Sequence, residues 1–150
     1  MLHSRLMDWE PLIAAATAAR AKAYAPYSRF TVGAAVLMED GSIHAGANVE
    51  NCIPSLSVCA ERNAVAAAVS AGLRSPRALA VVTEMSPPAR PCGLCRQTLA
   101  EAKHASCIFA GSLAACHPPT DLRRLAVEGS ERTADRIYQP LRCGVRCFRG

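Results

Sequence analysis

The sequence lacks a run of 18 or more apolar residues, which excludes a helix long enough to span a membrane. Its first residues, MLHSRLMDWEPL, also lack the apolar core and the small-residue cleavage pattern of a secretory signal. We therefore expect a cytoplasmic protein with no membrane partner. Its eight cysteines should stay reduced in that compartment and be free to bind metal.

Charged residues are scarce, at 19% of the chain, whereas hydrophobic residues make up 51%. This composition excludes an intrinsically disordered chain and is typical of a packed globular protein. A length of 150 residues is close to the commonest size of one domain. We predict a single domain over residues 1–150, in which residues 112–150 show no clear helical or strand pattern.

The net charge of +5 does not come from a large basic cluster. Residues 1–104 contain ten Lys/Arg and eight Asp/Glu, and residues 105–150 contain seven and four. The last fourteen residues carry three arginines and no acid, so much of the excess lies at the C-terminal end. The charge therefore predicts no nucleic-acid partner.

The order of the local patterns predicts an α/β fold in which helices cover a mixed sheet. Asp8 is expected to cap the first helix, and Gly72 to terminate the second. The Asp40-Gly41 pair lies between β-branched segments and predicts a hairpin. The expected elements are a helix over 8–23, hairpin strands over 31–38 and 42–49, a helix over 59–72, an apolar and central strand over 77–83, a helix over 92–104 and a strand over 106–111; short helices could form around 121–127 and 131–138.

Three cysteines occur where two of these helices are expected to begin. Cys59 opens the second helix, and Cys92 and Cys95 lie in PCGLCRQ at the start of the third. Helix N-termini favour thiolates. A pair three residues apart, with a third ligand from a neighbouring helix, suits a tetrahedral zinc ion that keeps one position for water. The chain's four histidines show no ligand spacing to one another, so we expect zinc to be bound by sulfur alone.

Glu61 and Arg62 lie two and three residues after Cys59 and suit a catalytic zinc site. A cysteine, a glutamate two residues later and a Pro-Cys-x-x-Cys segment match the known signature of zinc deaminases. Zinc lowers the pKa of water, and Glu61 would move that proton to the ring nitrogen of an aminopyrimidine and help to expel ammonia. Arg62 could donate hydrogen bonds to the sulfurs and offset their negative charge. Taken alone, Glu61 could instead complement the helix dipole, and Arg62 could form a surface salt bridge.

Four motifs, YSRFTVGAAV, GANVEN, VCAERNAV and PCGLCRQTLAE, follow one another over residues 24–102. Together they resemble the cytidine deaminases of the small, homotetrameric, three-cysteine type. The resemblance implies a three-layer α-β-α sandwich with a five-stranded mixed sheet, a Zn²⁺ cofactor and a homotetramer. It also implies hydrolytic deamination of cytidine and deoxycytidine in pyrimidine salvage.

The same resemblance implies which residues bind the nucleoside. Phe30 would pack beside it, Asn48 and Glu50 would hold the ribose 3′-hydroxyl, and Ala60 would contact the substrate. A buried pair that is built to bind a hydroxyl discriminates strongly against ligands that lack one. Without the resemblance, Phe30 would be interpreted as a core residue and Asn48 as a turn residue at a strand end.

Two segments depart from the family pattern. Cys52, Ile53, Pro54 and Ser55 stand where relatives carry a segment with a tyrosine that commonly reaches a neighbouring subunit. Beyond residue 104 the usual ending is absent, so no role is transferred to Phe148. A deaminase of another aminopyrimidine nucleoside, such as blasticidin S, therefore remains an alternative.

The cysteines leave other functions open. Cys92 and Cys95 could form a dithiol redox pair, although that leaves Cys59 and Glu61 unexplained. A closed structural zinc site could recruit Cys107 as a fourth ligand. The remaining cysteines divide into Cys52 and Cys107, expected to be small buried hydrophobes; Cys116, which has no assigned role; and Cys143 and Cys147, which could form a second metal site.

Overall fold

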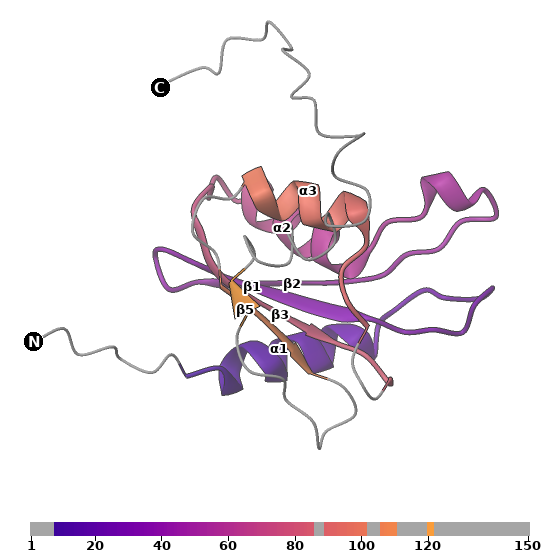
Figure 1. Ribbon diagram of the computed structural model, residues 1–150, viewed down its shortest axis with the longest axis horizontal. Helices are drawn as coiled ribbons and strands as arrows, with labels where there is room; N and C mark the ends of the chain where they lie inside the picture. Colours follow the sequence, from indigo (N-terminus) through magenta and orange to yellow (C-terminus); the bar gives the residue numbers. More distant parts are fainter. Residues whose placement is uncertain (1–7, 86–88, 102–105, 111–119, 122–150) are drawn as a thin grey trace, which may run out of the picture.

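The structure is a computed structural model that describes residues 8–85, 89–101, 106–110 and 120–121. It confirms the predicted α/β fold (Figure 1). The short helix predicted around 131–138 lies outside the described residues, and Asp121, expected to begin a helix, instead lies in a strand. The elements are α1 Glu10–Arg20, β1 Gly33–Met38, β2 Ile43–Ala47, the 3-10 helix η1 Pro54–Leu56, α2 Ala60–Ser70, β3 Pro76–Val82, α3 Gly93–Glu101, β4 Ser106–Ala110 and β5 Thr120–Asp121.

The strands pair in the order β2-β1-β3-β4-β5, and the sheet is mixed. β1 is antiparallel to both β2 and β3, whereas β3 is parallel to β4. The hairpin of β1 and β2 closes through Gly41, whose φ of 86° suits glycine. β3 lies between β1 and β4, which confirms the prediction that this apolar strand is central.

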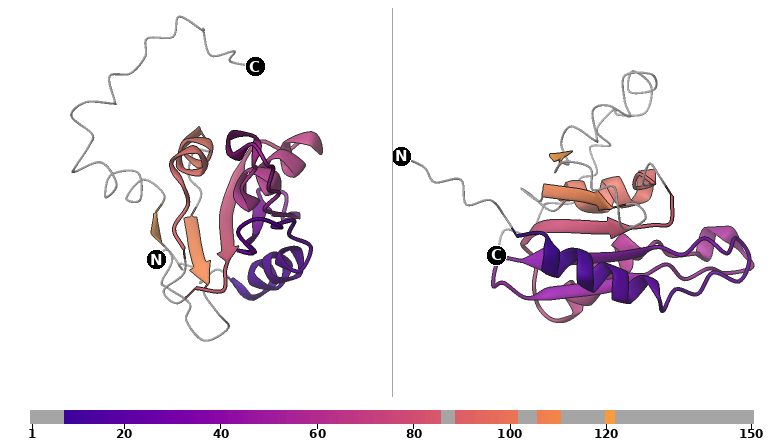
Figure 2. Two further views of the ribbon diagram at one scale, coloured as in Figure 1. Left: turned by 90° about the vertical axis from the view of Figure 1, so that its right-hand side faces the viewer. Right: turned by 90° about the horizontal axis from the view of Figure 1, so that it is seen from below.

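Helices cover both faces of the sheet: α1 lies on one face, and α2 and α3 lie on the other (Figures 1 and 2). Successive residues of a strand point to opposite faces, so β1 and β3 supply two separate cores. One core packs against α2 and contains Ala34, Val36, Met38, Leu79 and Val81 with Ala60, Ala64, Ala68 and Leu99. The other packs against α1 and contains Ala35, Ala78, Ala80 and Val82 with Leu12 and Ala16.

The structure confirms one of the two predicted helix ends and contradicts the other. Gly72 has a φ of 89°, and the amides of Gly72 and Leu73 bond back to carbonyls of α2, which confirms the predicted helix terminator. The prediction that Asp8 caps the first helix is wrong. Trp9 occupies the cap position, and the Asp8 carboxylate accepts only the Glu10 amide, at 3.1 Å.

Two glycines allow the helices to approach the hairpin closely. A Cβ atom on Gly33 would lie 1.9 Å from the Ala16 carbonyl oxygen of α1, and one on Gly46 would lie 2.5 Å from the Ala64 amide nitrogen of α2. Both clashes are with backbone, so no side-chain rotation could relieve them. Close contact of α2 with β2 fixes the helix whose first residues carry the candidate site.

We predict that Gly33→Ala lowers the free energy of unfolding by about 2 kcal/mol or more, because α1 must move away from β1. Urea unfolding of the purified protein measures this change. Gly93→Ala is the matched control, since nothing lies within 4 Å of a Cβ at that position. Equal unfolding midpoints for Gly33→Ala and the unaltered protein would contradict the close approach.

Candidate metal centre

Three cysteine sulfurs meet where α2 and α3 begin. Cys59 precedes α2, Cys92 precedes α3, and Cys95 lies in the first turn of α3. The carbonyl of Cys59 accepts the Asn63 amide, and that of Cys92 accepts the Arg96 amide, so each cysteine joins the first helical hydrogen bond. The helices thereby bring together thiols that are 33 residues apart in sequence.

The sulfur positions fit a metal ion. The Sγ atoms of Cys59 and Cys92 are 3.6 Å apart, and those of Cys92 and Cys95 are 3.5 Å apart. All three lie within 4.8 Å of one another and form the one metal-compatible group found in the described residues. A tetrahedral zinc ion with Zn–S bonds of about 2.3 Å would separate its sulfurs by about 3.8 Å. The three thiols could therefore hold zinc and leave its fourth position open.

The thiols share their protons unequally. Hydrogen bonding from Cys95, and then from Cys92, lowers the pKa of Cys59 to about 5 despite the opposing effect of burial. The pKa of Cys95 is raised, chiefly because its thiol donates to Cys59 and also because it is buried. The lowered pKa of Cys59 favours its thiolate, which is the form that binds metal.

Arg62 lies beside this charge. Its guanidinium lowers the pKa of Cys59, and its Nη2 donates to the Ser57 carbonyl at 3.0 Å. Its Nε is buried and has no hydrogen-bond partner among the residues that the structure describes. The side chain therefore connects the cluster with the segment that precedes α2.

Glu61 is almost completely buried in the first turn of α2, with 5% of its surface exposed. Burial raises its pKa, and the charge of Cys59 raises it further, whereas a hydrogen bond from Cys95 opposes the shift. These interactions show that its carboxyl group lies close to the cysteines. A raised pKa makes a carboxylate a better proton acceptor.

A cavity of about 470 Å³ opens beside Cys59. Asn48 and Glu50 line it together with the 51–58 segment, and Tyr27 and Ser28 line another side. Segments 24–32 and 48–58 extend together beyond one end of the sheet (Figures 1 and 2). The described lining includes neither Phe30, which is half-buried, nor Glu61.

Two sequence interpretations change at this cavity. Cys52 was expected to be buried, but it is exposed and lines the cavity, because the loop before η1 lies on the surface. Ala60, the first residue of α2, has no exposed surface and belongs to the core between α2 and the sheet. Cys107 lies in β4. The other C-terminal positions discussed above, Cys116, Cys143, Cys147 and Phe148, are outside the described residues.

Asn48 and Glu50 form hydrogen bonds to the segment that carries Phe30. The Asn48 side chain accepts the Val32 amide and donates to the Phe30 carbonyl, both at 2.8 Å. Glu50 accepts the amides of Tyr27 and Ser28 at 2.9 and 3.2 Å and the Ser28 hydroxyl. The bond from Ser28 is the main cause of the lowered pKa of Glu50. Sequence reasoning overlooked Ser28, whose only signal was its place in YSRF.

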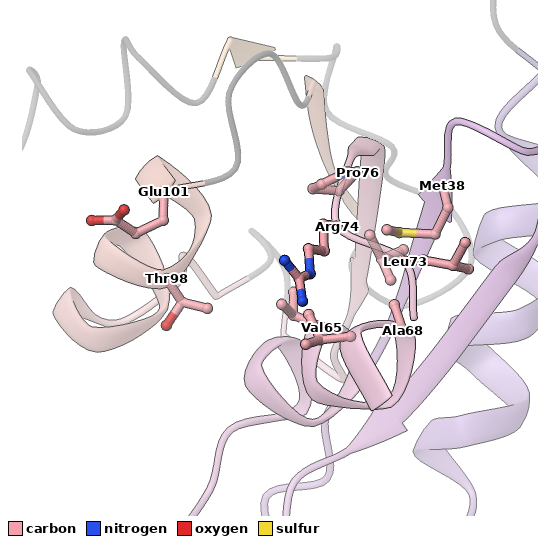
Figure 3. Close-up of a pocket in the computed structure, with 10 residues that line it drawn as sticks. Met38, Val65, Ala68, Leu73, Arg74, Pro76, Thr98 and Glu101 are labelled. Atoms are coloured by element: carbon pink, nitrogen blue, oxygen red, sulfur yellow. The ribbon is translucent and has the colours of Figure 1, made fainter. Parts of the chain in front are cut away.

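A second cavity, of about 140 Å³, lies between α2, α3 and the sheet (Figure 3). Apolar side chains such as Val65 and Met38 line most of it, with Arg74, Thr98 and Glu101 at its edge. None of the predicted site residues lines this cavity. The candidate site is therefore the cavity beside Cys59.

Fold and site together define an α/β domain in which three thiols that could hold a metal ion lie at the start of two helices, with the buried Glu61 in the first turn of one of them. Residues 7–111 match the family model for the cytidine and deoxycytidylate deaminase zinc-binding region. The chain belongs to this family. The match to a zinc-binding region and the three-thiol cluster together identify zinc as the cofactor. In the described part of the chain, no helix is long and apolar enough to cross a membrane.

Relatives and solved structures agree with this assignment. The chain is 56% identical over 95 residues to a cytidine deaminase of Sporosarcina psychrophila, which covers 63% of this chain and 70% of the relative. A crystal structure of cytidine deaminase from Burkholderia pseudomallei superposes with a TM-score of 0.75 at 42% identity, over 79% of this chain and 96% of that one. A crystal structure of cytidine deaminase from Mycobacterium tuberculosis superposes with a TM-score of 0.68 at 41% sequence identity, over 79% of this chain and 94% of that one.

We predict that Cys92→Ser weakens zinc binding by about 100-fold or more, since even changes next to metal ligands cost 10- to 100-fold. Zinc per chain is measured by elemental mass spectrometry after dialysis against a weak chelator. Cys52→Ser is the control, because it removes an exposed thiol outside the cluster. Stoichiometric zinc retention by Cys92→Ser would contradict the proposed ligand set.

Proposed function

We propose that the protein deaminates cytidine and deoxycytidine hydrolytically to uridine and deoxyuridine, as part of pyrimidine salvage. The observation that carries this function is the three-thiol cluster with the buried Glu61 against it, in a chain of the deaminase family. The closely similar relatives are cytidine deaminases, which favours cytidine over blasticidin S or another aminopyrimidine nucleoside.

In this mechanism Cys59, Cys92 and Cys95 hold zinc. Bound zinc supplies Lewis-acid activation of the attacking water. The positive ends of α2 and α3 stabilise the thiolates, and Arg62 offsets the excess negative charge that three sulfurs bring. The position of Arg62 beside Cys59 supports this role.

Glu61 moves the protons. It takes a proton from the attacking water and delivers it to the ring nitrogen next to the amino-bearing carbon. The second proton of the same water, on the oxygen now bonded to the ring carbon, then passes to the amino group. The C–N bond breaks, that oxygen becomes the carbonyl, and ammonia leaves, so that water and cytidine yield uridine and ammonia. Burial supports both transfers, because it raises the pKa of the carboxyl group toward neutral pH.

Asn48 and Glu50 would bind the ribose 3′-hydroxyl with the capacity that their other hydrogen bonds leave. The Asn48 oxygen accepts the Val32 amide and one Asn48 N–H donates to the Phe30 carbonyl, so a second N–H remains among the described contacts. Glu50 accepts three hydrogen bonds from the described residues, and a carboxylate offers about four acceptor positions. One donor and one acceptor are what a hydroxyl group requires.

The remaining features of the site and assembly follow the family. The strand order supports a complete three-layer sandwich with a five-stranded mixed sheet in one domain over 1–150. Phe30 would pack beside the base once a nucleoside enters, and Ala60 would contact the substrate only after a local rearrangement. We further propose a cytoplasmic homotetramer that acts on free nucleosides and not on nucleic acid. Exposed Tyr24, Tyr27, Ile53 and Leu56 support the assembly, because a neighbouring subunit would cover them.

Loss of the 280 nm absorbance of cytidine tests the function directly. We predict that Glu61→Gln lowers kcat by about 10²- to 10⁴-fold, because it removes the proton acceptor but keeps the side-chain shape. Zinc content should remain at the level of the unaltered protein, which separates a catalytic carboxyl group from a structural one. A folded, zinc-loaded protein that leaves cytidine and deoxycytidine unchanged would refute the proposal, as would full activity of Glu61→Gln.

The assembly has its own test. Light scattering should give four times the chain mass of 15.9 kDa. Leu56→Asp places a charge on the exposed apolar group near the cavity and should shift the mass toward smaller species. Val69→Asp is a matched control, because Val69 is also exposed but lies on α2. A single-chain mass for the unaltered protein would reject the tetramer.

A further inference from the structure

Residues 25–32, here called the cavity loop, follow a strained path beside the candidate site. Tyr27 and Ser28 of this loop line the cavity, and Phe30 lies two residues further on. Between Ser28 and Phe30, Arg29 has a φ of 57°, in the left-handed region. A side chain in that region costs about 1–2 kcal/mol. The loop needs specific contacts to hold this conformation.

The hydroxyl of Ser28 is the contact at the centre of the loop. It donates its proton to Oε1 of Glu50 and accepts the backbone amide of Phe30 at 3.0 Å. A serine hydroxyl has one proton and two lone pairs, so both bonds can form together. The hydroxyl therefore connects the carboxylate of Glu50 with the backbone of Phe30 and spans the strained Arg29.

We propose that Ser28 is a positioning residue for nucleoside binding, which it achieves by holding the carboxylate of Glu50 in fixed relation to the backbone of Phe30 beside the cavity. This role rests on the proposed function of the site. Glu50 has about one acceptor position left. The amides of Tyr27 and Ser28 hold Oε2 of Glu50, and the Ser28 hydroxyl holds Oε1, so the hydroxyl fixes the second of the two carboxylate oxygens. Without the hydroxyl, Oε1 and the Phe30 amide each lose the partner that the described residues give them. A supporting bond of this kind keeps a binding group within the narrow range that recognition requires.

Another serine offers the same chemistry away from the cavity. The hydroxyl of Ser42 donates to the carboxylate of Asp40 at 2.7 Å in the turn between β1 and β2. Neither Ser42 nor Asp40 is among the residues that line the cavity. Ser42→Ala therefore removes an equivalent hydrogen bond without touching the proposed site.

The test compares Ser28→Ala, Ser28→Thr and Ser42→Ala in the zinc-loaded protein. Ser28→Ala should raise the KM for cytidine about tenfold, with kcat changed less than about threefold, because a bond to a charged group is lost while Glu61 is untouched. Hydrogen–deuterium exchange of the cavity loop should also become faster in this variant. Ser28→Thr keeps the hydroxyl and should therefore keep the KM and the loop exchange rate of the unaltered protein. Ser42→Ala should also match the unaltered protein in KM and in loop exchange rate.

Several results would overturn the proposal. Unchanged loop exchange in Ser28→Ala would show that the hydroxyl does not hold the loop. A fall in kcat at constant KM would place the effect on the chemical step, and an equal effect of Ser42→Ala would reduce it to general stability. If the unaltered protein does not deaminate cytidine, the proposed function fails independently of Ser28. In that case, faster exchange of the cavity loop in Ser28→Ala without a change in uridine affinity would reject the role of Ser28.

Discussion

The candidate site depends on two helices that begin at the same point. Thiols that precede or open α2 and α3 converge there, and each helix directs unpaired amides toward the gathered negative charge. Three sulfurs that lie within 4.8 Å of one another would repel one another as free anions, so a cation at their centre is the natural way to stabilise them. The carboxyl group of Glu61 and the guanidinium of Arg62 follow from the same geometry, since both belong to the first turn of α2.

The sheet makes this convergence possible because the helices pack against it and are held in place. Gly46 lets the backbone of α2 approach β2, and small alanines such as Ala64 and Ala68 fill the interface without separating helix from strand. The cavity is built differently. It lies between two loops that extend beyond the sheet, and side-chain bonds from Asn48 and Glu50 hold them together. Regular packing therefore places the three-thiol cluster, while a hydrogen-bond network shapes the cavity beside it.

Most of the fold and the metal cluster could be predicted from the sequence, because their signals are local. The hairpin at Gly41, the helix end at Gly72 and the apolar strand β3 each follow from a few neighbouring residues, and the Pro-Cys-x-x-Cys segment contains two of the three thiols. The missed features depend on distant contacts. Ala60 is buried because it packs with residues of β1, β3 and α3, Cys52 is exposed on the loop before η1, and the bond from Ser28 to Glu50 joins residues 22 apart. The periodic patterns of a sequence do not predict contacts between residues that are far apart in the chain.

X-ray absorption spectroscopy at the zinc edge tests the central claim most directly, because it counts the ligands of the ion in the intact protein. The account predicts one zinc ion per chain with three sulfur neighbours at about 2.3 Å and one oxygen or nitrogen neighbour at about 2.0 Å. A shell of four sulfurs would mean a closed structural site, and fewer than three sulfurs would mean that the thiols of α2 and α3 do not share one ion. Either result would contradict the account.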